Sequence, residues 1–179
     1  MVGTVKEVHG LSPPSDWICA MLTTHGEGAC DVIDLACGSG RHARWCAELG
    51  LSVLAVDRNP QHAESLVPLG VQFLEADLEG SEWPLVGQQA DVVIVSNYLY
   101  RPRLAQISEL VAEGGLLIYE TFGVGNAAFG KPSNPDFLLE ASELEITFSD
   151  RFDVLETFFG MVSEPKPAIR SRFCGRRRG

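Results

Sequence analysis

The sequence predicts an α/β protein in which helices cover both faces of a parallel sheet. Short apolar runs alternate with helical patterns along the 179-residue chain, which is typical of parallel strands joined by crossover helices. The clearest example is the apolar run at residues 31–35, which leads through two glycines into a helical pattern at residues 40–49. A chain of this length suits a single domain with a substantial core.

The remaining elements continue the same alternation. In the helix at 40–49, Ala43, Cys46 and Ala47 form an inward apolar stripe that ends before Gly50. The expected elements after it are a strand at 53–57, a short helix from Asn59 to about Pro68, strands at 73–77 and 92–98, a helix from Pro102 to Gly114, a strand at 116–122, a helix at 142–149, and strands at 153–162 and 168–176.

The glycine turn after the first strand indicates a nucleotide-cofactor site. Gly38 and Gly40 place no Cβ between the backbone and a ligand, and Ala43 lets the next helix pack closely on the strand. The same spacing fits the dinucleotide fingerprint of dehydrogenases, with Asp57 near the position that binds a ribose hydroxyl. Asp34 instead favours a cofactor that carries an ammonium group, because its carboxylate would repel a pyrophosphate. The alternative for Asp34 is a structural role, as a turn cap or as the partner of a nearby arginine.

With these residues, the stretch resembles motif I of the class I S-adenosylmethionine-dependent methyltransferases, and the resemblance extends over most of the chain. It implies that Asp57, at the end of the second strand, holds both ribose hydroxyls, and that Asp77 and Leu78, after the third, meet adenine. It also implies a Rossmann-like fold, with a mostly parallel seven-stranded sheet, an antiparallel closing strand and helices on both faces.

The resemblance further implies the cofactor and the site residues. The expected cofactor is S-adenosyl-L-methionine. Tyr98 and Tyr100, at the end of the fourth strand, are expected on the acceptor side, where an acceptor meets the methyl group. The expected cofactor-binding residues are Asp34, Ala36, Gly38, Gly40, Asp57, Arg58, Asp77, Leu78 and Asn97. No metal ligands are expected.

A narrower resemblance follows the fifth strand. The segment Tyr119-Glu120-Thr121-Phe122, with Gly125-Asn126 and the run from Phe129 to Leu139, resembles small bacterial methyltransferases of the tellurite-resistance type. Those relatives imply a small, soft acceptor or one that is not yet defined. The fourth strand ends in Ser-Asn-Tyr-Leu-Tyr rather than the Asn/Asp-Pro-Pro-Tyr run of many amino-group methyltransferases, so transfer to a nucleobase amine or to glutamine is disfavoured.

Residues 123–137 contain three glycines, two prolines and two asparagines, which predicts an irregular loop rather than a helix or strand. We expect a lid that is mobile without ligands and ordered with them. The single domain 1–179 is then expected to comprise an N-terminal cap segment (1–30), a cofactor-binding core (31–122), the lid loop (123–137), and a C-terminal helix and strand pair (138–179).

Methyl transfer from a sulfonium demands little acid-base machinery, because the methyl group is already activated. For an acceptor that loses a proton, the candidate bases are Tyr98, Tyr100, His42 and Glu120. Each has a structural alternative: the tyrosines as pocket walls, His42 as a solvent-facing helix residue, and Glu120 as a helix-cap or loop-pinning partner. Trp17 either covers the site or fills the core.

Composition restricts the partners. The formal net charge is −10, and the last ten residues carry five arginines, so the remaining chain has a charge of −15 and would repel polyanions such as nucleic acid. The arginine-rich end is interpreted as a solvated tail. Arg101 and Arg103 either attract an anionic acceptor or pair with nearby acids.

Five cysteines without a Cys-x-x-Cys pair indicate reduced thiols rather than zinc or disulfides. Residues 1–20 lack a signal-peptide pattern, and no apolar run is long enough to span a membrane, so a cytoplasmic location is expected.

Three functions remain open: a methyltransferase acting on a small molecule, a non-catalytic cofactor-binding module, and an NAD(P)-dependent oxidoreductase. The methyltransferase is preferred because Asp34 argues against the oxidoreductase, and because the residues after the cofactor half leave no room for a hydride-acceptor domain.

Overall fold

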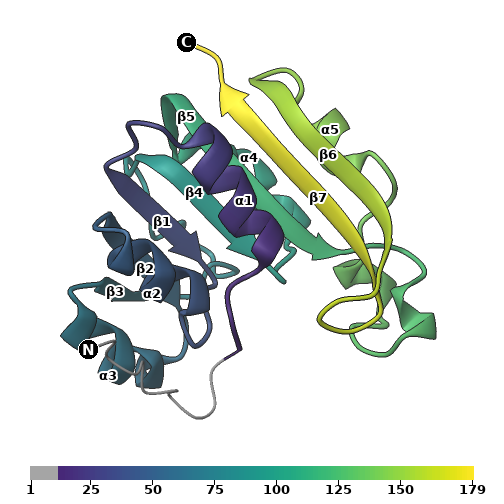
Figure 1. The fold of residues 1–179 in the computed structure, drawn as a ribbon, viewed down its shortest axis with the longest axis horizontal. Helices are drawn as coiled ribbons and strands as arrows, with labels where there is room; N and C mark the ends of the chain where they lie inside the picture. Colours follow the sequence, from purple (N-terminus) through teal and green to yellow (C-terminus); the bar gives the residue numbers. More distant parts are fainter. Residues whose placement is uncertain (1–11) are drawn as a thin grey trace, which may run out of the picture.

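The computed structural model describes residues 12–179 and contains a seven-stranded sheet with helices on both faces (Figure 1). The strands lie in the order β3-β2-β1-β4-β5-β7-β6. β7 is antiparallel to β5 and β6, and the other neighbours are parallel. The bounds are β1 Asp31–Leu35, β2 Ser52–Asp57, β3 Gln72–Glu75, β4 Ala90–Ser96, β5 Val111–Phe122, β6 Phe152–Val162 and β7 Ala168–Arg177. The expected Rossmann-like fold class is confirmed.

Each face of the sheet has its own core. α1 (Asp16–His25), α2 (Arg41–Glu48) and α3 (Ala63–Leu66) pack on one face, where Ile18 and Cys46 are fully buried. α4 (Leu104–Glu109) and α5 (Glu143–Phe148) pack on the other, around four aromatic rings whose neighbouring centres are 5.3 to 6.4 Å apart: Tyr119, Phe148, Phe152 and Phe173. The central strands β1, β4 and β5 therefore bury both of their faces, which explains their nearly continuous apolar sequences.

The order of the strands reverses at β1, because β2 lies on one side of it and β4 on the other. Ligands of open α/β sheets bind at the carboxyl ends of the strands where such a reversal occurs. The glycine turn follows β1 directly, so the topology brings this turn to the usual place of a ligand.

Several predicted boundaries are wrong: the strand expected at 73–77 ends at Glu75, and further differences surround β4. The helix expected to run to Gly114 ends at Glu109, and β5 begins at Val111, because residues 110 and 111 already turn into the sheet and Ala90 pairs with Val111. The fourth strand ends at Ser96, two residues early, because Asn97 has a left-handed backbone (φ 57°) that a strand cannot continue. Both differences around β4 come from tertiary pairing that a local pattern does not contain.

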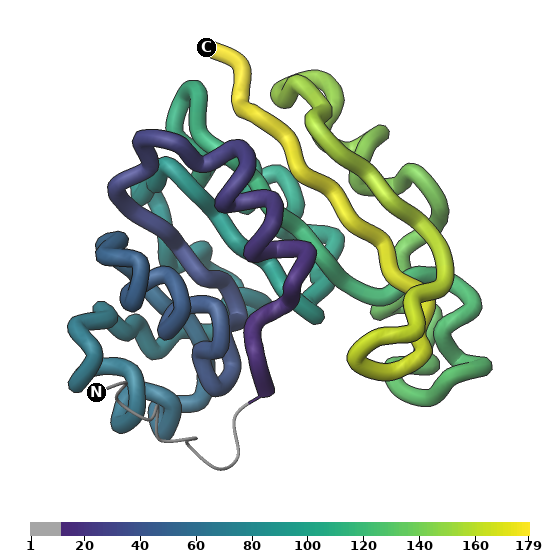
Figure 2. The backbone as a smooth tube through the Cα atoms, viewed as in Figure 1, coloured from purple at the N-terminus to yellow at the C-terminus, as the bar shows by residue number. Residues whose placement is uncertain are grey.

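The interpretation of the C-terminal arginines as a solvated tail is also wrong. Four of the five arginines lie in β7, which runs between β5 and β6, and Arg178 follows it directly (Figure 2). Arg172 and Arg178 form ion pairs with Glu120 and Asp153, whereas Arg176 and Arg177 donate to backbone oxygens. A strand inserted between two others needs partners for long basic side chains, and the neighbouring strands and loops supply them.

The loop at 123–137 is anchored beside the turn between β6 and β7 (Figure 2). It contains two single 3-10 turns, Asn126–Ala128 and Pro135–Phe137. Asn126 is buried, and its side chain donates to the oxygen of Pro132 and accepts from the amide of Ile169. The loop is therefore tied to β7 near its start, while Phe129 and Phe137 remain about half exposed.

The helices in residues 12–179 are each too short or too polar to cross a bilayer. Residues 1–11 lie outside the described part of the chain. The expectations of an N-terminal cap segment and of no signal peptide both concern these residues in part. The cysteines at 19, 30, 37, 46 and 174 are free.

Candidate functional site

The glycine turn holds its shape through positive backbone angles. Gly38 and Gly40 have φ values of 55° and 75°, and Ala36, before them, also has a positive φ of 51°. A Cβ on Gly40 would lie 2.4 Å from a methyl group of Leu66, so the residue also permits α3 to pack against the turn. A Cβ on Gly38 would have no heavy atom within 4 Å, so this glycine faces open space.

Asp57 ends β2 and fixes the glycine turn. One carboxylate oxygen accepts from the amide of Gly38 at 2.8 Å, and the other accepts from the amide of Asn59 at 2.9 Å. A carboxylate has about four acceptor positions, so two remain for a ligand. Asp57 therefore has a structural role, and it keeps acceptor positions for the ligand that the sequence predicts.

Asp34 is buried beneath the turn. Its carboxylate accepts from the amide of Ala43 at 3.0 Å, in the first turn of α2. Burial raises the pKa of this carboxyl to about 7, against the opposing effects of that hydrogen bond and of Arg41. The capping role that the sequence left open is present, and Asp34 also lines a cavity beside the turn.

A cavity of about 310 Å³ lies at the ends of β2 and β3. Asp77 is held by a bond from the Glu79 amide to its carboxylate, at 2.9 Å. Leu78 supplies a buried apolar wall. The residues that line the cavity are Ala36, Asp57, Arg58, Ala76, Asp77, Leu78, Glu79, Tyr98 and Phe137.

Two more cavities adjoin it. One, of about 290 Å³, lies beside the glycine turn and is lined by Ser12, Asp34, Ala36, Cys37, Gly38, Ser39, Arg41, His42, Ser96 and Asn97. The other, of about 270 Å³, lies at the ends of β4 and β5 and is lined by Glu79, Asn97, Tyr98, Leu99, Thr121, Phe122, Pro132 and Phe137. Ala36 lines both the cavity at β2 and β3 and the cavity beside the glycine turn. Asn97 lines both the turn cavity and the cavity at β4 and β5 (the third cavity). Tyr98 and Phe137 lie between the third cavity and the cavity at β2 and β3.

Tyr98 and Tyr100 have different environments. Tyr98 lines two cavities, its hydroxyl has no hydrogen-bond partner within residues 12–179, and burial raises its pKa. Tyr119 donates to the backbone oxygen of Tyr98 at 2.8 Å and fixes this turn. Tyr100 precedes the 3-10 turn Arg101–Arg103 and is not among the residues that line the three cavities.

His42 is neither solvent-facing nor placed as a base. It is 2% exposed, and its Nε2 accepts from the amide of Ser15, the N-cap of α1, at 3.1 Å. Burial, followed by the charge of Arg41, lowers its pKa to about 3. The expectation of a solvent-facing residue is therefore wrong: α1 covers His42 across the sheet face, a contact between segments distant in sequence.

The other candidate residues have protein partners. Glu120 is buried and forms a 2.6 Å ion pair with Arg172, whose guanidinium also lies 5.4 Å from the centre of the Trp17 ring. Arg101 forms a bidentate pair with Glu143 and donates to two loop oxygens, while Arg103 donates to Gly80 and lies over Trp83. Pairing with nearby groups, rather than with an acceptor, therefore accounts for Arg101 and Arg103.

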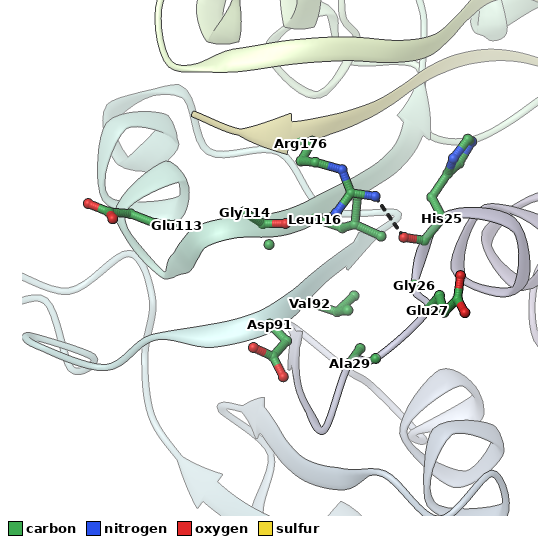
Figure 3. A pocket seen from close by; sticks show the side chains of 12 residues that line it. His25, Gly26, Glu27, Ala29, Asp91, Val92, Glu113, Gly114, Leu116 and Arg176 are labelled. Carbon is green, nitrogen blue, oxygen red and sulfur yellow. Dashed lines mark hydrogen bonds between the residues drawn. The ribbon is translucent and has the colours of Figure 1, made fainter. Parts of the chain in front are cut away.

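A further cavity lies at the opposite, amino edge of the sheet, between the loop after α1 and strands β4 and β5 (Figure 3). Arg176 reaches into it from β7 and donates to the backbone oxygens of His25 and Gly114 at 2.8 Å. These bonds tie α1 to β7, which is a structural function.

At the carboxyl edge, the sequence did not single out four residues as part of the site: Glu79, Phe137, Arg41 and Arg170. Phe137 lies in the expected lid, and Arg41 follows the glycine turn directly, so both had a local signal. Arg170 had none, because a strand far along the chain brings it to the end of β4.

The fold has the class I methyltransferase architecture, as the resemblance predicted. Residues 32–115, somewhat less than half of the chain, match the family model described as a methyltransferase domain. This part of the chain is therefore similar to a methyltransferase domain. No curated protein matches the chain.

Solved structures show the same fold at low identity. TehB from Haemophilus influenzae superposes with a TM-score of 0.75 and 18% identity over 92% of this chain, which spans 63% of that protein. The magnesium protoporphyrin IX methyltransferase of Synechocystis PCC 6803, with bound SAH, superposes with a TM-score of 0.69 and 19% identity, over 90% of this chain and 80% of that one. The Burkholderia thailandensis 1,6-didemethyltoxoflavin-N1-methyltransferase superposes with a TM-score of 0.67 and 17% identity, over 92% of this chain and 78% of that one.

Proposed function

We propose that this protein transfers a methyl group from S-adenosylmethionine to a small-molecule acceptor. The observation that carries the proposal is the row of three adjoining cavities at the carboxyl edge of the sheet. These cavities meet around Asn97 and Tyr98. Their combined size suits an elongated cofactor together with a small acceptor, rather than a cofactor alone.

The residues present fit this cofactor. Gly38 leaves open space beside the backbone, and Asp57 has free acceptor positions for a ribose. Asp77 and Leu78 combine a carboxylate with an apolar wall, which suits a purine ring. In this proposal, the cavity with Asp34 and Arg41 takes the amino-acid end, and the cavity with Ala36, Arg58 and Asp77 takes the adenosine end.

The bound cofactor would supply an electrophilic methyl group on a sulfonium. The chain then has to hold an acceptor lone pair in line with that methyl group and to exclude water. Tyr98 and Asn97 stand at the junction of the cavities and would orient the acceptor, while Phe137 of the loop would cover it. His42 and Glu120 are engaged within the protein, which supports an acceptor that needs no strong base from this site.

Two relatives support the class of reaction. The Synechocystis protein contains bound SAH, and the Burkholderia protein contains both S-adenosylhomocysteine and 1,6-didemethyltoxoflavin, a small molecule. For this chain we propose the same kind of transfer, in the cytoplasm, without nucleic-acid substrates. The free cysteines and the strongly negative net charge support these two points.

Thermal shift and calorimetry with S-adenosylmethionine, S-adenosylhomocysteine, NAD and NADP test the proposal. We expect stabilisation by the first two only. Preference for NAD or NADP would establish the oxidoreductase alternative. Binding of S-adenosylmethionine without S-adenosylhomocysteine formation, over thiol, selenide, tellurite, amine and carboxylate acceptors, would favour a non-catalytic module.

A further inference from the structure

Arg170 lies against two residues that line the third cavity. It pairs with Phe122 across β5 and β7, and its guanidinium lies 4.0 Å from the centre of the Phe122 ring. It also donates a hydrogen bond to the side-chain oxygen of Asn97. Phe122 and Asn97 both line the third cavity, so the guanidinium is held in a fixed orientation by two walls of that cavity.

The charge of Arg170 is not balanced by the protein. Among residues 12–179, no carboxylate lies within 4.0 Å of it, and the nearby acid Glu120 is already paired with Arg172 at 2.6 Å. Partial burial lowers the pKa of Arg170, the carboxylate of Glu120 opposes this shift, and the neighbouring Arg41 and Arg172 lower the pKa further. Besides Arg170 itself, the charged groups that act on this pKa are thus two guanidiniums and one carboxylate, in a chain whose net charge is −10.

Neither Arg170 nor Arg41 has an ion-pair partner within 4.0 Å among residues 12–179. Arg41 lines the cavity beside Asp34 and the glycine turn, where the carboxylate of an amino-acid cofactor would lie. Arg170 reaches the site from β7, behind Asn97 and Phe122, and has at most one of its five N–H donors on Asn97. A planar guanidinium with free donors matches the geometry of a carboxylate.

Leu99, Phe122 and Pro132 give the third cavity apolar walls, while Glu79, Asn97, Tyr98 and Thr121 add polar groups. Its volume of about 270 Å³ exceeds the needs of an inorganic ion. We propose that Arg170 binds a carboxylate group of an organic methyl acceptor, whose apolar body packs against these walls. The inference rests on the proposed methyltransferase function and names the class of its substrate.

The test compares two thiols of one shape, 3-mercaptobenzoate and 3-mercaptobenzamide. Calorimetry measures their binding to the wild-type protein saturated with S-adenosylhomocysteine, and S-adenosylhomocysteine release measures their methylation. We expect the benzoate to bind at least tenfold more tightly than the amide. Arg170→Gln should remove that preference, a change of about 1.4 kcal/mol, while binding of the amide stays constant. Arg170→Lys should retain part of it, because the charge remains but the fork is lost.

Arg178→Gln is the matched control, since Arg178 is an exposed arginine of the same C-terminal segment and pairs with Asp153 away from the cavities. It should behave as the wild type. Equal binding of the two thiols, no binding of the benzoate, or insensitivity to Arg170→Gln would overturn the inference. If selenite binds more tightly than the benzoate, Arg170 binds inorganic oxyanions instead, and the inference is overturned. If Arg170→Gln binds S-adenosylhomocysteine more weakly than the wild type does, Arg170 contacts the cofactor rather than the acceptor, and the inference is overturned as well. Absence of S-adenosylhomocysteine binding by the wild type would instead refute the proposed function itself.

Discussion

Acidification should remove the contribution that the neutral His42 side chain makes to the stability of this protein. Its imidazole is buried and neutral, and Nε2 already accepts the amide of Ser15 at the start of α1. Protonation would place a second N–H opposite that amide and beside Arg41. The folded pKa of about 3 lies well below the value of about 6.5 expected in an unfolded chain.

The sign follows from proton counting. Between pH 3 and 6.5, the unfolded state binds more protons at this residue than the folded state, so the free energy of unfolding rises with pH and falls on acidification. At pH 5 the unfolded histidine is about 1.5 pH units below its pKa, and each unit is worth about 1.36 kcal/mol. The loss at pH 5 is therefore about 2 kcal/mol relative to pH 7.

Urea unfolding at pH 5 and pH 7 measures this loss in the wild type and in His42→Gln, which keeps an acceptor and does not titrate. The opposing contribution of Asp34, whose pKa is raised to about 7, is present in both proteins and cancels in the comparison. Above pH 7 the two curves should run parallel, which serves as an internal control. The protection factor of the Ser15 amide against hydrogen exchange, which corrects for the slower intrinsic exchange at low pH, should fall near pH 5 as this contribution is lost. Identical pH dependence in both proteins would refute the argument.

Three further outcomes concern the site. Asp57→Ala should weaken S-adenosylhomocysteine binding by about 1.5 to 3 kcal/mol, the range for hydrogen bonds to a charged group; unchanged affinity by calorimetry would reject the ribose role, and Asp57→Asn controls for the turn that this residue also fixes. Tyr98→Phe should lower turnover and leave cofactor affinity intact if the unpaired hydroxyl contacts the acceptor, whereas an unchanged rate would make Tyr98 a wall residue. Residues 123–137 should be cleaved more slowly by protease when cofactor and acceptor are both bound; equal cleavage rates would make the segment a plain connection.

The sequence was sufficient where the determinants are local. The glycines of the turn, the apolar run of β1 and the acids near the ends of β2 and β3 are contiguous or regularly spaced. Their pattern predicted the sheet, its carboxyl edge as the ligand edge, and nine of the residues that line the three cavities. The strand pair β6 and β7 was likewise expected within one residue at each end. Such features depend on backbone angles and on alternating burial, which neighbouring residues determine.

Tertiary structure decided the contacts between distant segments. His42 is buried only because α1 lies over it, and Asn97 ends β4 only through a left-handed turn at the sheet edge. Arg170, Arg172 and Arg176 looked like a basic tail in sequence, yet the insertion of β7 between β5 and β6 supplies each with a partner on another segment. A charged side chain gives no local signal of its partner. Its role is determined by which strand lies beside it, and that pairing is fixed by burial of the whole sheet rather than by the residues next to it in sequence.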